Sequence, residues 1–171
     1  MKHILLSLIA TVLLASCSGK NARDLYADAR AAEDSGNVFL ALEKFEELVQ
    51  DYPAEAVAET AIYRLVMIRS GTPGDKGPAV EAQTRFLRLY PNSLEAPKVT
   101  FMLAFLYNNE MMQIDSAKKY YELFLALYPA HELAPSAKFE LETLGKGLEE
   151  LLGEVEALVP AQKIPTPGAR R

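Results

Sequence analysis

The chain has 171 residues, a formal net charge of −5 at pH 7 and 50% hydrophobic residues, which suits one domain with its own core. Its mildly acidic balance argues against nucleic acid as a partner, because binding to phosphates needs clustered lysine and arginine. The single cysteine excludes a disulfide within the chain.

Residues 1–16 show the pattern of a secretory signal peptide. Lys2 supplies the positive charge, and an apolar stretch from Ile4 to Leu14 follows it. This stretch is too short for a transmembrane helix, which needs roughly 20 apolar residues to cross a bilayer. We therefore expect that the chain is exported and that residues 1–16 are removed.

The residues around Cys17 resemble the lipobox of bacterial lipoproteins, with Leu14, Ala15 and Ser16 before the cysteine. The resemblance implies that the Cys17 thiol is acylated, that cleavage occurs before it, and that its new amino group is acylated too. Each buried methylene contributes about 0.8 kcal/mol, so two or three acyl chains would hold the protein on a membrane. In such lipoproteins an aspartate directly after the cysteine is associated with retention in the inner membrane. This chain has Ser18 at that position, which favours the periplasmic face of an outer membrane. The alternative is an ordinary signal peptide cut near Ser16, which would leave a free thiol.

An internal repeat of 38 residues organises the chain after a short tether at residues 17–21. The segments 40–53, 78–91 and 116–129 align without a gap, and each ends in a Tyr-Pro pair. A period of this length is typical of a solenoid, in which neighbouring units share a continuous core.

Each repeat is predicted to form a helical hairpin. Apolar residues in 40–52 follow helical spacing, and the proline after each tyrosine disfavours a helical conformation there and so ends the helix. Turn residues at 35–37, at 71–75 and at Asn108-Asn109 separate the paired helices. We expect three pairs between residues 22 and 128, followed by a helix at 132–144.

The C-terminal part is predicted to hold a capping helix and a tail. An apolar stripe over residues 148–158 (Leu148, Leu151, Leu152, Val155 and Leu158) would cover the last open face of the stack and complete a helical domain at 22–159. Residues 160–171 contain three prolines and no apolar period, so a disordered tail is expected.

The repeat resembles that of the tetratricopeptide repeat (TPR) family. In the first unit the matching residues are Leu25, Ala29, Gly36, Ala41, Phe45 and Pro53. The second unit departs from the pattern with Gln83 at the aromatic position, and the third restores it with Tyr121. The period of 38, against a usual length of about 34, indicates one extra helical turn per unit.

The longer period, the Tyr-Pro endings and the lipobox together are similar to TPR lipoproteins of the outer membrane. The chain is most similar in these features to the BamD-like component of the β-barrel assembly machinery, which has five repeats, and to the TPR domain of the Tol-Pal coordinator. The resemblance spans residues 22–144. It implies an all-α, right-handed TPR-like solenoid of antiparallel helix pairs.

The residue patterns contain no catalytic constellation. Once His3 leaves with the signal peptide, His131 is the remaining histidine, and His131-Glu132 lacks the second histidine of a zinc motif. The loop at residues 71–77 lacks the lysine and hydroxyl ending of a phosphate loop. We therefore expect no enzyme activity, cofactor, metal or small-molecule substrate, and an enzyme remains a distant alternative.

The family resemblance implies a binding groove lined by the first helix of each pair. By position it contains eight residues: Arg23, Tyr26, Arg30, Tyr63, Met67, Lys98, Phe101 and Phe105. For Tyr63, Phe101 and Phe105, packing between helices is the favoured alternative. Tyr26 and Arg30 are the stronger candidates, because tyrosine and arginine combine contact area with directed hydrogen bonds.

The predicted function is that of a membrane-anchored scaffold that binds envelope proteins through this groove. The leading hypothesis is a role in outer-membrane β-barrel assembly. The alternative is an adaptor for peptidoglycan remodelling or for a Tol-Pal-type envelope function.

Overall fold

The structure, a computed structural model, describes residues 20–147, 149–150 and 152–153. Within these ranges it contains seven α-helices and no strand. The helices are α1 (Ala22–Asp34), α2 (Val38–Asp51), α3 (Ala56–Gly71), α4 (Gly77–Leu89), α5 (Ala96–Asn109), α6 (Ile114–Leu127) and α7 (Ala134–Thr143).

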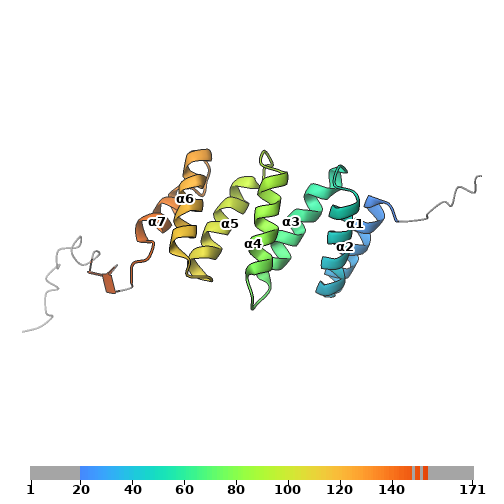
Figure 1. Ribbon diagram of the computed structural model, residues 1–171, viewed down its shortest axis with the longest axis horizontal. Coiled ribbons are helices and arrows are strands. Elements are labelled where there is room, and N and C mark those ends of the chain that lie inside the picture. Colours follow the sequence, from blue (N-terminus) through green and yellow to red (C-terminus); the bar gives the residue numbers. More distant parts are fainter. Residues whose placement is uncertain (1–19, 148, 151, 154–171) are drawn as a thin grey trace, which may run out of the picture.

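The helices are stacked in chain order along the long axis of the molecule (Figure 1). Each helix packs against the next, and α1 also contacts α3, so that the first pair is stacked on the second. This arrangement confirms an all-α fold of the TPR-like helical-repeat kind, with three pairs followed by α7.

Three predicted segments fall largely on residues that the structure does not describe. The signal peptide, Cys17 and the tail at 160–171 lie outside the described residues. Of the capping stripe at 148–158, the described residues 149–150 and 152–153 are helical, and the others also lie outside.

The Tyr-Pro pairs end the second helix of each unit, as predicted. Tyr52, Tyr90 and Tyr128 are the C-caps of α2, α4 and α6, and each backbone N–H donates to the carbonyl four residues earlier at 2.8–2.9 Å. The Tyr90 ring packs on Phe86 and the Tyr128 ring on Phe124, with centroids 5.8 and 5.6 Å apart. The tyrosines therefore close the helix ends and also extend the core.

The turn predicted at Asn108-Asn109 is wrong. Helix α5 continues through Asn109, and Met112, which has a φ of 54°, lies in the turn that follows. The Asn109 side chain donates to the Phe105 carbonyl at 3.2 Å, and that of Asn108 donates to Glu140 of α7 at 3.2 Å. Both side chains therefore have partners that are compatible with a helix, and the turn forms one step later.

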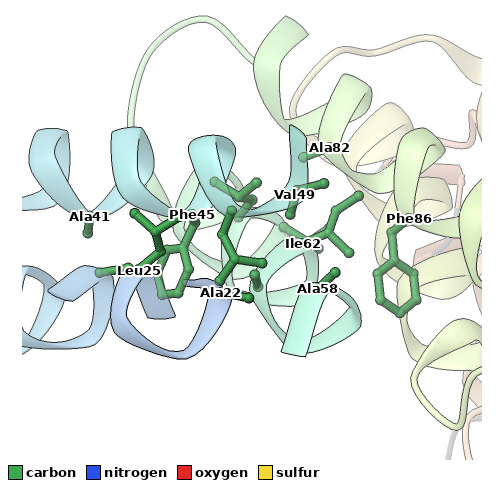
Figure 2. Close-up of a cluster of buried hydrophobic side chains, with 14 of the residues drawn as sticks. Ala22, Leu25, Ala41, Phe45, Val49, Ala58, Ile62, Ala82 and Phe86 are labelled. Carbon is green, nitrogen blue, oxygen red and sulfur yellow. The ribbon is translucent and has the colours of Figure 1, made fainter. Parts of the chain in front are cut away.

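Small residues bring the helices close together around a few large side chains. Ala41 and Ala117 are fully buried at equivalent repeat positions, where a larger side chain would push the helix axes apart. Figure 2 shows Leu25, Phe45 and Ile62 directed into the space between the helices. The buried apolar residues form two clusters, one between positions 22 and 99 and the other between 104 and 137, so that α5 belongs to both.

Gly36 terminates α1 with a left-handed backbone, which gives a stability prediction. Its φ is +78°, and a Cβ built there has no heavy atom within 4 Å. Gly36→Ala should therefore lower the free energy of unfolding through backbone strain alone, by about 1–2 kcal/mol in urea titrations. Gly71 has equal space and no positive φ, so Gly71→Ala is the matched control and should be neutral or slightly stabilising. Equal losses in the two variants would contradict the strain argument.

Candidate protein-interaction face

The eight residues predicted to bind a partner lie on the first helices of the three pairs. Their distribution is Arg23, Tyr26 and Arg30 on α1, Tyr63 and Met67 on α3, and Lys98, Phe101 and Phe105 on α5. Each is half-buried or exposed. We call this set the first-helix face, and its members are open to contact from outside.

Ion pairs join α1 to α3 along this face. Arg30 pairs with Glu33 at 2.7 Å and with Asp34 at 3.0 Å on its own helix. Glu33 also accepts a hydrogen bond from Arg64 of α3, whose Nε lies 3.1 Å from Oε2. The hydrogen bond to Glu33 raises the pKa of Arg30, so its guanidinium stays charged. A partner that binds Arg30 must therefore share it with these two carboxylates.

Tyr63 and Lys98 join α3 to α5. The Lys98 Nζ lies 5.7 Å from the centroid of the Tyr63 ring, within the range of a cation–π contact. A hydrogen bond to the Tyr63 side chain raises the pKa of Lys98. The Tyr63 ring also packs on Phe86, at a centroid distance of 5.8 Å. The Tyr63 ring therefore packs against the core and also contacts the Lys98 ammonium group at the surface.

The aromatic residues of α5 divide between core and surface. Phe101 meets Tyr121 and Phe124 edge to face, at centroid distances of 5.7 and 5.8 Å. Phe105 lies beside Phe101 at 6.4 Å and remains 43% exposed. Packing therefore accounts for much of Phe101, whereas Phe105 offers apolar area to a partner.

A pocket opens beside Phe105, where α3, α4 and α5 meet. It has a volume of about 230 Å³ and is lined by Ser70, Gln83, Phe101, Met102, Phe105, Leu106 and Glu110. The sequence marks Gln83 as a departure from the repeat pattern, but we did not predict a pocket there. The signal for it is present in the repeat, since the equivalent Phe45 and Tyr121 are large, fully buried rings.

Over the described part of the chain, no group of three or more histidine, cysteine or acidic side chains is arranged to hold a metal ion. None of the helices described has the length and apolar character needed to cross a bilayer.

A stack of helix pairs with a 38-residue period and a partly exposed face on its first helices defines a TPR-like helical-repeat protein. Residues 18–151 match the model of the YfiO family, which is described as outer membrane lipoprotein, and the chain belongs to this family. The resemblance to BamD-like TPR lipoproteins is thereby confirmed. No curated protein matches the chain. The family is one of non-enzymatic scaffolds, and membership supports an outer membrane lipoprotein with a role in envelope assembly.

Proposed function

We propose that this protein is a lipid-anchored scaffold on the periplasmic side of the outer membrane that binds a component of the β-barrel assembly machinery. The observation that carries the proposal is the match to an outer membrane lipoprotein family across the whole helical stack, residues 18–151. The first-helix face is the proposed docking surface.

The proposed anchor is acylated Cys17, close to the start of the fold. The Lys20 carbonyl accepts a hydrogen bond from the Tyr52 hydroxyl at 2.8 Å, which fastens the chain to the end of α2. Only Ser18 and Gly19 separate Cys17 from this fastened residue. A tether of this length would keep the first helix pair beside the membrane.

The chemistry of the first-helix face suits an acidic or amphipathic segment of the partner. Arg23 and Lys98 are exposed cations, and Met67 and Phe105 add exposed apolar area. Cations at the rim steer an acidic partner, while desolvated apolar anchors supply most of the affinity.

Co-purification from detergent-solubilised membranes tests this proposal. The wild-type protein should recover a barrel-assembly protein, and Lys98→Glu should reduce the recovery about 5-fold or more by reversing a charge at the docking face. Lys118→Glu is the matched control, because Lys118 is an exposed lysine on α6 whose ion pair with Glu122 is long, at 4.0 Å. Its recovery should equal that of the wild type.

Two outcomes would contradict the proposal. One is the absence of any barrel-assembly protein in the wild-type eluate, for example with a cell-wall enzyme in its place. The other is an equal loss of recovery in both charge-reversal variants.

A further inference from the structure

The pocket beside Phe105 lies where one repeat unit lacks an aromatic ring. Phe45 and Tyr121 occupy equivalent positions in the first and third units, and both are fully buried. In the second unit Gln83 stands there, 38 residues from each of them. Its side chain is narrower than a ring, and a pocket of about 230 Å³ opens between it and α5.

Gln83, which lines this pocket, also carries an unpaired acceptor. Its side chain is only 1% exposed, and its Nε2 donates to the Ser70 hydroxyl at 2.8 Å. Its Oε1 has no hydrogen-bond partner, and it is the one buried side-chain polar atom of the described residues in this state. Such an atom is costly to bury, because it has lost its water without gaining a protein donor. A ligand that supplies a donor would recover this lost interaction.

The walls determine what kind of donor fits. Phe101, Met102, Phe105 and Leu106 make the lining largely apolar, which disfavours a charged group. Glu110 lies at the same pocket, but its carboxylate is already paired with Lys76 at 2.9 Å. The suitable ligand is therefore an apolar body that carries one neutral N–H or O–H.

The size of the pocket restricts the ligand to a single side chain. An apolar cavity of about 150 Å³ holds one benzene molecule, and sites for drug-sized ligands measure about 300–1,000 Å³. At about 230 Å³ this pocket lies between the two. Tryptophan and tyrosine combine a ring of this size with one donor.

We propose that the pocket receives a tryptophan or tyrosine side chain of the partner protein, whose N–H or O–H donates to Gln83 Oε1. The inference rests on the proposed function, because it places this anchor at the edge of the first-helix face, next to the exposed Phe105. It defines a contact that selects the partner by a hydrogen bond as well as by shape.

Indole and indene are suitable probes, because they have nearly the same shape and only indole has an N–H. In the full-length protein with ¹³C-methyl methionine, indole should shift the Met102 signal saturably at about millimolar affinity and leave that of Met67 unchanged. Indene should bind about 2- to 10-fold more weakly, as expected for the loss of one hydrogen bond. Equal binding of the two probes, or no saturable shift at Met102, would overturn the proposal.

Two substitutions of Gln83 separate the roles of the acceptor and of the space. Gln83→Met keeps the length of the side chain and removes the acceptor, so indole and indene should then bind alike. Gln83→Phe restores the ring of the other units and should fill the pocket, with indole affinity reduced at least about 10-fold and with a thermal midpoint no lower than that of the wild type. A preference for indole that persists in Gln83→Met would contradict the assignment of Oε1.

Co-purification with Gln83→Phe connects the pocket to the partner. If the wild type recovers a barrel-assembly protein and the folded Gln83→Phe variant recovers at least about 5-fold less, the anchor is supported. Equal recovery would show that the pocket admits free aromatic molecules instead of a side chain of the partner, which overturns the inference and leaves the proposed function intact. If the wild type recovers no such protein, the proposed function fails. The comparison of indole with indene, in the wild type and in Gln83→Met, then still tests whether the pocket binds an aromatic donor.

Discussion

Phe45→Ala should lower the free energy of unfolding by about 3–5 kcal/mol, because it removes a fully buried ring from the core. Phe45 is 0% exposed, and its ring meets Tyr26 of α1 at a centroid distance of 5.8 Å. Its removal leaves a cavity between the first two helices that the fully buried Ala29 and Ala41 are too small to fill. Urea titration followed by circular dichroism measures the loss.

Phe39→Ala is the matched control on the same helix. Phe39 is 79% exposed, so its truncation should change the stability by less than about 0.5 kcal/mol. If both variants lost the same amount, the ring of Phe45 would not be a main support of the first helix pair, and the described packing would be contradicted.

Replacement of Cys17 should release the exported protein from the membrane. To separate acylation from retention of the signal peptide, Cys17→Ala is combined with an ordinary cleavable signal peptide in place of residues 1–16. Two or three acyl chains contribute about 0.8 kcal/mol per buried methylene, and no described helix could span the bilayer in their place. We therefore expect the variant in the soluble periplasmic fraction, without incorporation of labelled palmitate.

Ser18→Ala with the native signal peptide is the control and should remain acylated and membrane-bound. If the Cys17→Ala protein stayed in the membrane fraction after removal of its signal peptide, the lipid anchor would be wrong. Labelled palmitate in that variant would lead to the same conclusion.

The local features of the fold could be predicted from the sequence because strong local constraints determine them. Proline after Tyr52, Tyr90 and Tyr128 restricts the backbone of each tyrosine, and the helices end there. The 38-residue period relates the apolar positions of one unit to those of the next. Pairing of the helices follows, since each unit covers its apolar face with its neighbours.

Features that depend on side chains from distant segments could not be predicted in this way. Asn108-Asn109 has the composition of a turn, but α5 includes both residues, and the Asn108 side chain donates to Glu140 of α7. The pocket also depends on distant residues: Gln83 is recognisable as an exception in the repeat, whereas the space beside it is bounded by side chains of α5. The division of α5 between Phe101 in the core and the exposed Phe105 is likewise a property of the stack.

Site-specific photo-crosslinking in intact cells is the most direct test of a docking surface on the first helices. The photoreactive residue p-benzoylphenylalanine replaces Met67 on α3 or Leu123 on α6, two apolar residues with 37% and 39% exposure. We predict an adduct with a barrel-assembly protein from position 67 and none from position 123. An adduct from position 123 alone, or equal adducts from both positions, would contradict the proposal that the first-helix face binds the partner.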